Sequence, residues 1–187
     1  MVLYFVKKIY IIYMNLQIDT LEKKHLCINH GGKNITPKIS WTSINNAESY
    51  ALILEDPDAV NGTFIHWYIP YINKNITNIN SLNNITNKLS NISDINLLNL
   101  SNKIKSMKLF YGKNSLNKFE YHGPCAPKDT GIHRYIFHLY ALNDIIKINE
   151  NTIKIDNSGQ FEEMLTKSDI KIISKDTIIY KYCYTNF

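Results

Sequence analysis

The fold is decided by residues 121–142, which read YHGPCAPKDTGIHRYIFHLYAL. The first half of this stretch is rich in glycine and proline, which are typical of a turning loop. The second half begins at His133 and is rich in aromatic and large apolar residues, which predicts a β-strand. Because strand side chains alternate, His133 and Tyr135 are expected on one face and Arg134 on the other. The loop and strand would then present an imidazole and a phenol side by side, as a small-ligand site requires.

The same pattern also fits a buried strand whose histidine and tyrosine satisfy each other, since buried polar groups are normally paired. A second stretch upstream favours a site. Residues 54–59 read LEDPDA and residues 64–67 read FIHW. Pro57 has no amide hydrogen for a strand ladder, so the apolar strand should end there and leave its carboxylates free to face a pocket. The next strand is predicted over 64–69, with Phe64, His66 and Tyr68 on one face.

Taken together, the two stretches resemble the phosphatidylethanolamine-binding protein family. The family pairs a D-P-D-A-P…H-W element with a later G-P-x-P-P…G-x-H-R-Y element, although Val60 replaces the last proline of the first element here. Residues 32–41, GKNITPKISW, resemble a third family segment, G-x-N-x-S-P-x-L-x-W. The residues that match the two main motifs are Asp56, Pro57, Asp58, His66, Trp67, Gly123, Pro127, Gly131, His133, Arg134 and Tyr135.

The resemblance implies an all-β protein, an antiparallel two-sheet β-sandwich with a small helical component near the C-terminus. The regular spacing of strands and turns is consistent with that fold. Further strands are predicted over 50–55 and 177–184. A helix is predicted to open at Ser158, which would serve as its cap. The short C-terminal part is similar to the compact bacterial members, because the animal members continue into a further helix.

The chain is expected to form one domain over residues 14–187, a length sufficient for a hydrophobic core. Residues 1–13 are an apolar extension of unknown role, interrupted by two lysines and shorter than the roughly 20 residues of a membrane span. Residues 73–105 are rich in Asn, Ile, Ser and Lys and are expected to be a low-complexity surface insertion. Its lysines also suit a peripheral contact with an anionic membrane.

The resemblance further implies a pocket that binds a phosphate-bearing small molecule or a phospholipid head group. Imidazoles and a phenol can donate to phosphate oxygens, while a carboxylate suits an ammonium or orients a histidine. If the histidines carry the charge, anion affinity should fall between about pH 6 and about pH 8. The candidate ligand-binding residues are Asp56, Asp58, His66, Gly123, Pro127, His133 and Tyr135, and the motif residues given a structural role are Pro57, Trp67, Gly131 and Arg134.

The resemblance thus predicts a non-enzymatic binding protein, regulatory in role, with a kinase or protease partner and no cofactor or metal. The alternative is a hydrolase that uses the Asp, His and Tyr cluster with Cys125. The chain contains none of the local motifs of serine hydrolases, P-loop nucleotide hydrolases or zinc proteases. A metal site on Asp56, His66 and His133 has suitable ligand types but no short-spaced ligand pair.

The net charge, the single arginine and the three cysteines limit which partners and which cellular compartment are expected. The net charge is +5, but five lysines against one aspartate between residues 73 and 108 carry most of it, which disfavours nucleic-acid binding. Arg134 is the chain's single arginine, and its planar fork suggests a bidentate pair with Asp58 that joins the two motif loops. The three cysteines, Cys27, Cys125 and Cys183, are predicted to be free thiols in a reducing compartment, and the protein to be cytoplasmic.

Overall fold

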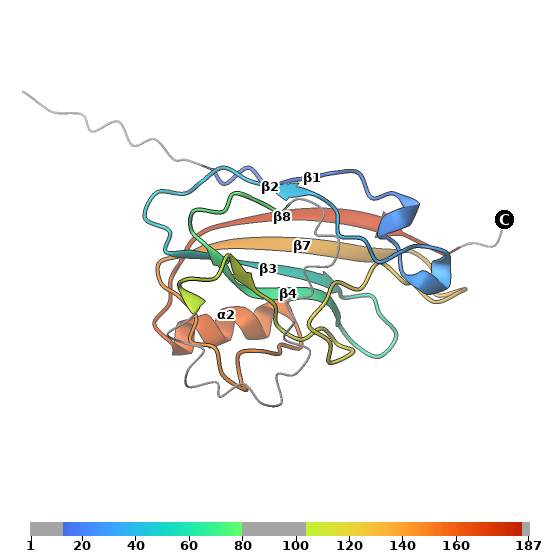
Figure 1. Ribbon diagram of the computed structural model, residues 1–187. Coiled ribbons are helices and arrows are strands. Elements are labelled where there is room, and N and C mark those ends of the chain that lie inside the picture. The colour runs from blue at the N-terminus through green and yellow to red at the C-terminus, as the bar shows by residue number, and fades with distance from the viewer. Residues whose placement is uncertain (1–12, 80–103, 185–187) are drawn as a thin grey trace, which may run out of the picture.

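The computed structural model describes residues 13–79 and 104–184. The predictions for residues 1–12 and for most of the 73–105 tract therefore lie outside the described residues. The described strands form two antiparallel sheets (Figure 1). The larger sheet has the order β6 (Leu109–Phe110), β4 (Phe64–Asn73), β3 (Ser49–Asp56), β7 (His133–Leu142) and β8 (Ile172–Tyr182). The smaller sheet has the order β1 (Gln17–Ile18), β2 (Ile39–Ser40) and β5 (Asn78–Ile79).

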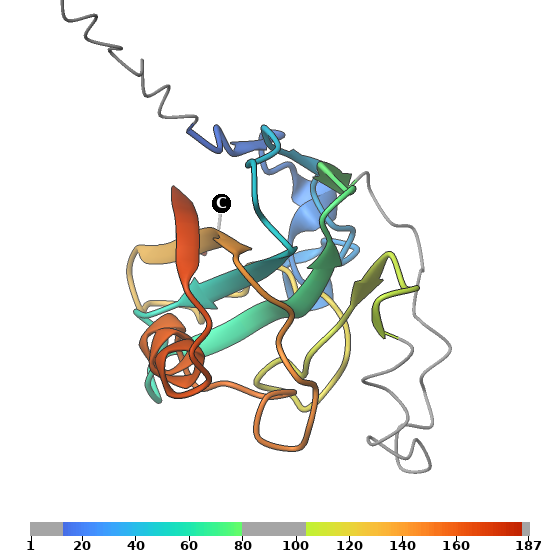
Figure 2. The ribbon, with the colours of Figure 1, turned by 90° about the vertical axis from the view of Figure 1, so that its left-hand side faces the viewer.

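The larger sheet lies between the smaller sheet and one helix, α2 (Ser158–Lys167), as Figures 1 and 2 show. One apolar core fills the space between the sheets and includes Leu52 and Phe137. A second core lies under α2 and includes Phe161 and Leu165 of that helix. All eight residues of β3 are buried, because this central strand is covered on both faces. The prediction of an all-β sandwich with a small C-terminal helical component is confirmed.

Strand β7 has the predicted bounds at its start and the predicted alternation. Tyr135 and Phe137 lie in the core between the sheets, while Tyr140 lies in the core beneath α2.

Strand β4 departs from simple alternation. Leu54 pairs with Trp67 while Glu55 pairs with Ile65, so one extra residue, His66, bulges out of β4. A bulge of this kind redirects the following side chains, and the prediction that Tyr68 shares a face with His66 is wrong.

The C-terminal elements differ from the sequence predictions in their bounds. The cap of α2 is Asn157, whose side chain accepts the Gln160 amide hydrogen at 2.9 Å, and Ser158 is the first helical residue. Strand β8 begins at Ile172, five residues earlier than predicted, because its first half pairs with the end of β7. Two short 3-10 helices, η1 (Lys23–His25) and η2 (Ile28–His30), precede β2. None of the helices among the described residues has the length and apolar character to cross a membrane.

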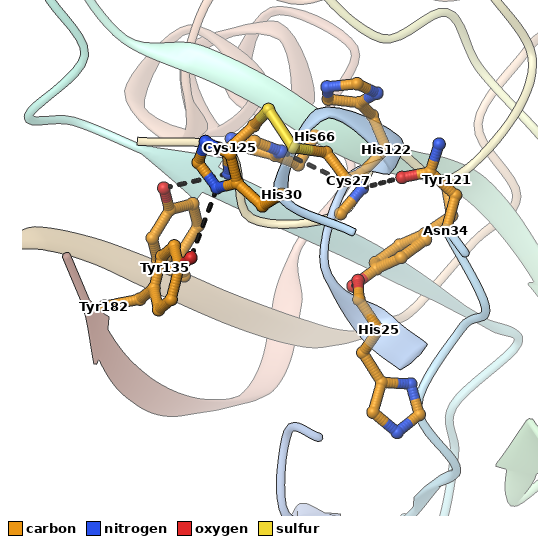
Figure 3. Close-up of a disulfide and its surroundings, with 11 residues drawn as sticks. His25, Cys27, His30, Asn34, His66, Tyr121, His122, Cys125, Tyr135 and Tyr182 are labelled. Atoms are coloured by element: carbon orange, nitrogen blue, oxygen red, sulfur yellow. Dashed lines mark hydrogen bonds between the residues drawn. A yellow bond between two sulfur atoms is a disulfide. The ribbon is translucent and has the colours of Figure 1, made fainter. Parts of the chain in front are cut away.

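The cysteine prediction is wrong for two of the three residues. Cys27 and Cys125 form a disulfide with an Sγ–Sγ distance of 2.08 Å (Figure 3). Cys183 is free. The bond joins residues 98 positions apart, which are close in the fold because η2 packs against the loop before β7. Sequence spacing cannot reveal such a contact. Because disulfides are typical of oxidising compartments, the inference of a reducing compartment loses its support.

Candidate functional site

A pocket of about 450 Å³ opens where β3 and β4 meet the loop before β7. Its apolar walls include Phe64, Leu116 and Pro127, and its polar groups include Asp56 and two histidines, His66 and His122. The complete lining is Asp56, Ala59, Val60, Asn61, Gly62, Thr63, Phe64, His66, Ser115, Leu116, His122, Cys125 and Pro127. Three of the seven candidate ligand-binding residues, Asp56, His66 and Pro127, thus line the pocket directly.

Asp56 is the buried carboxylate of this pocket. It is the last residue of β3 and is only 3% exposed. Its Oδ1 accepts the Asp58 amide hydrogen at 2.9 Å, a turn that Pro57 helps to form. Its Oδ2 lies 2.7 Å from Nδ1 of His133. The end of one strand and the start of its neighbour are therefore tied by a buried Asp–His pair.

The other nitrogen of His133 is also occupied by the protein. Nε2 lies 2.9 Å from the hydroxyl oxygen of Thr130, and that hydroxyl donates its hydrogen to the Pro127 carbonyl at 2.7 Å. Both ring nitrogens of His133 are therefore engaged by groups of the protein. This leaves no free nitrogen on His133 for a metal or a ligand. His133 instead holds Asp56 in place.

His66 has the opposite role. Its Nδ1 lies 2.9 Å from the His122 carbonyl oxygen, and its own carbonyl accepts the His122 amide hydrogen at 2.9 Å. Burial lowers the pKa of His66 to about 3, so the ring is neutral at physiological pH. Because Nδ1 donates to a carbonyl, Nε2 carries the lone pair. The bulge in β4 thus brings a neutral imidazole with one accepting nitrogen to the pocket lining, in contrast to the charged imidazole expected from the sequence.

His122 is a pocket residue that the sequence reasoning missed. Its ring stacks on that of His66, with centroids 5.7 Å apart and planes 18° apart. Burial lowers its pKa as well. Its position directly before the Gly-Pro of the second motif is a signal that could have identified it.

Tyr135 lies behind the pocket and is fully buried. Its hydroxyl oxygen accepts the Cys125 amide hydrogen at 3.2 Å, and its ring meets the edge of His66 at a centroid distance of 5.2 Å (Figure 3). Burial, together with the nearby charge of Asp56, raises the pKa of Tyr135. The phenol is therefore neutral and orients the loop that carries Cys125.

Asp58 points away from the pocket and pairs with Arg134. Nε and Nη2 of Arg134 donate to the two carboxylate oxygens at 2.8 Å and 2.7 Å, and the Arg134 amide donates at 2.9 Å. The guanidinium lowers the pKa of Asp58 to about 2. The proposed bidentate tie between the motif loops is confirmed as a contact, and it lies at the surface, where Arg134 is 47% exposed.

The remaining motif residues shape the backbone. A Cβ on Gly123 would clash with the His25 carbonyl, and the Gly123 amide donates to Asn34 Oδ1 at 2.9 Å. Gly131 has a φ of +84°, which favours glycine. Trp67 is fully buried and packs edge-on against Tyr121, with ring centroids 5.5 Å apart.

A second polar cluster lies on the other face of the large sheet. Glu55 accepts hydrogen bonds from His138 Nε2 at 3.0 Å, from the Ser158 hydroxyl at 2.7 Å and from the Ser158 amide at 2.8 Å. Ser158 therefore donates to the carboxylate and not to the histidine, so the cluster ties α2 to the sheet and does not activate a nucleophile. Cys125 is held in a disulfide, which removes the thiol that the hydrolase alternative required.

Comparison with known proteins assigns the sequence to one protein family. The family model described as phosphatidylethanolamine-binding protein matches residues 15–182, and the chain belongs to this family. A UPF0098 protein of Methanothermobacter thermautotrophicus is 32% identical over 126 residues, which are 67% of this chain and 72% of that protein. A UPF0098 protein of Aquifex aeolicus is 33% identical over 126 residues, which are 67% of this chain and 62% of that protein.

Solved structures agree on the fold. A phosphatidylethanolamine-binding protein homologue from Chlamydia trachomatis superposes with a TM-score of 0.64 at 23% identity, covering 92% of this chain and 99% of that one. Escherichia coli YbcL, described as a new member of the mammalian family, superposes with a TM-score of 0.65 at 18% identity, covering 93% and 100%. At these identities the likeness concerns the fold alone.

Proposed function

We propose that this protein is a non-enzymatic binding protein whose pocket takes a phosphate ester that carries an ammonium group, the chemistry of an ethanolamine phosphate head group. The observation that supports this most directly is the pairing of two acceptors at the pocket, the carboxylate of Asp56 and the neutral Nε2 side of His66. Acceptors need a ligand that brings hydrogens, and an ammonium brings three. A bare anion finds a carboxylate there and is repelled.

The hydrogen bonds of Asp56 leave room for a ligand that donates a hydrogen. Its two oxygens accept from the Asp58 amide and lie against His133, and each carboxylate oxygen has a second lone pair for a further donor. The apolar walls at Phe64, Leu116 and Pro127 suit the carbon atoms of the ligand. A regulatory role through a kinase or protease partner belongs to the same proposal and is supported by the family resemblance.

The experiment compares phosphoethanolamine with phosphocholine by isothermal titration calorimetry. The two ligands share the phosphate ester, but the quaternary ammonium of phosphocholine has no N–H to donate. We expect phosphoethanolamine to bind at least about tenfold more tightly, the factor of a 1.4 kcal/mol difference. The variant Asp56→Asn should reduce that preference, whereas Asp58→Asn, on the same loop but facing outward, should preserve it. Equal affinities for the two ligands would contradict the proposal.

Vesicle sedimentation distinguishes a free head group from a lipid in a membrane. Binding to vesicles that contain phosphatidylethanolamine, but not to phosphatidylcholine vesicles, would identify the lipid as the source. Binding of phosphoethanolamine in solution without vesicle binding would identify a soluble phosphate ester.

A further inference from the structure

The disulfide and His30 form a cluster that the pocket does not use. Sγ of Cys27, Sγ of Cys125 and a ring nitrogen of His30 all lie within 4.8 Å of one another (Figure 3). Over residues 13–79 and 104–184, no other three His, Cys, Asp or Glu side chains lie close enough to share a metal ion. Two thiolates and an imidazole are a ligand set that zinc favours.

Local structure places two of these side chains on one side of a short helix. Cys27 is the residue before the 3-10 helix η2, and His30 is the last residue of that helix. The helix spans only three residues, so Cys27 and His30 stay close, and their ligand atoms lie on the same side as Sγ of Cys125. Cys27 and His30 form a Cys-x-x-His pair, which is not detected when only the spacing between cysteines is considered.

The imidazole of His30 is held in place by the end of β8. Its Nδ1 lies 3.2 Å from the Tyr182 hydroxyl, and its ring stacks on Tyr184 with centroids 4.0 Å apart and planes 6° apart. Histidine ligands to metals are usually fixed by a hydrogen bond from the other ring nitrogen. The contact with Tyr182 fixes the orientation of the ring beside the two sulfur atoms.

We propose that reduction of the Cys27–Cys125 disulfide creates a zinc site in which both thiolates and the His30 imidazole bind one Zn²⁺, with water in the fourth position. A dithiol reductant supplies two electrons and two protons to the disulfide and becomes a disulfide itself. The two cysteine thiols then release their protons as they bind the metal. Zn–S bonds of about 2.3 Å and Zn–N bonds of about 2.0 Å suit three ligand atoms grouped this closely.

The site would cross-link the same two segments in the reduced protein that the disulfide joins in the oxidised protein. Cys125 belongs to the loop that borders the ligand pocket, and its amide donates to Tyr135. The Cys27 amide also donates to the Pro124 carbonyl at 3.1 Å, so the segments remain adjacent when the covalent bond is broken. The loop beside the pocket is thus held by one of two alternative bonds, according to redox state.

The test is a titration of the reduced protein with Co²⁺, which occupies zinc sites and absorbs strongly when thiolates bind it. The reductant is removed under anaerobic conditions before titration. Reduced wild-type protein should bind one equivalent with thiolate-to-cobalt absorption that Zn²⁺ abolishes, and the oxidised protein should show none. The Cys183→Ser variant is the matched control and should behave as wild type, whereas Cys27→Ser and Cys125→Ser should lose the absorption. His30→Ala should weaken binding at least about tenfold.

A second measurement uses the wild-type chain and does not depend on the folding of variants. Zinc should slow the alkylation of Cys27 and Cys125 at least tenfold in the reduced protein, as read by mass spectrometry, and leave Cys183 unchanged. Equal alkylation rates with and without zinc, cobalt affinity that is unchanged in His30→Ala, or cobalt binding that is lost in Cys183→Ser would overturn the proposal.

Discussion

Two buried histidines, one from each family motif, make different hydrogen bonds in this protein. Both ring nitrogens of His133 are engaged within the protein, one by Asp56 and the other by Thr130, so this residue holds the carboxylate in place. His66 donates once, to the His122 carbonyl, and is neutral because burial lowers its pKa to about 3. Residue identity alone therefore does not specify whether a motif histidine is a donor or an acceptor toward the ligand.

The pH dependence of anion binding separates these roles. His66 gains a charge only as the pH falls toward about 3, so it contributes no positive charge to the pocket between pH 6 and pH 8. Burial also lowers the pKa of His122. Sulfate has a constant charge in this range, and its weak affinity should therefore change less than about twofold between pH 6 and pH 8. A clear fall in sulfate affinity over that interval, measured by calorimetry, would restore the charged-imidazole pocket expected from the sequence.

The Arg134–Asp58 pair should contribute modestly to stability. Arg134→Lys keeps the charge and loses the fork, so the melting temperature should fall slightly at pH 7. The pKa of Asp58 is lowered from its usual 3.8 to about 2, so the contribution is present above about pH 4 and is lost as pH falls through about 2. The difference in melting temperature between the two proteins should accordingly vanish near pH 2. An unchanged melting temperature at pH 7 would show that solvent screening cancels the pair.

At the scale of elements, helix α2 contributes both to the second apolar core and to the polar cluster around Glu55. Phe161 and Leu165 are buried beneath it, and Ser158 at its first turn binds Glu55 of the central strand. The cap, Asn157, is one residue earlier than predicted. Glu55 fixes where the helix begins, because its carboxylate accepts from both the amide and the hydroxyl of Ser158.

Removal of the cap should destabilise the protein. The Asn157 side chain satisfies the Gln160 amide, and Asn157→Ala should therefore cost about 1 kcal/mol of unfolding free energy. Urea denaturation gives this value directly. The matched control is Asn151→Ala, an exposed asparagine in the loop before the helix, which should leave the midpoint nearly unchanged. Equal effects of the two changes would argue against a capping contribution.

At the scale of the whole molecule, the described ends of the low-complexity tract can be placed relative to the core. The start of the low-complexity tract belongs to the fold, since Ile79 of β5 pairs with Ile39 of β2 and is only 2% exposed. Ile104, the first described residue after residues 80–103, is also 2% exposed. The predicted surface insertion is therefore best tested over residues 80–103.

Replacing residues 80–103 with a short Gly/Ser linker should leave stability nearly unchanged. Loop closure entropy grows slowly with length, by roughly 0.6 kcal/mol for each doubling. Thermal unfolding followed by circular dichroism should remain cooperative, with a melting temperature close to that of the full chain. Loss of cooperative unfolding would mean that this tract completes the core.

The sequence by itself determined the family, the sandwich and the approximate place of the site, because motif residues and alternating strands are local patterns. It also indicated the Arg134–Asp58 pair, since the planar fork of the chain's single arginine suits a carboxylate and the two residues belong to the two motif stretches. Only the tertiary structure decided the Cys27–Cys125 bond, the bulge at His66 and the part played by His122. Each of these depends on contacts between residues far apart in the chain. The pKa of His66 follows from its burial in the folded protein, and the hydrogen-bonding role of each histidine is fixed only when the strands and loops surround it.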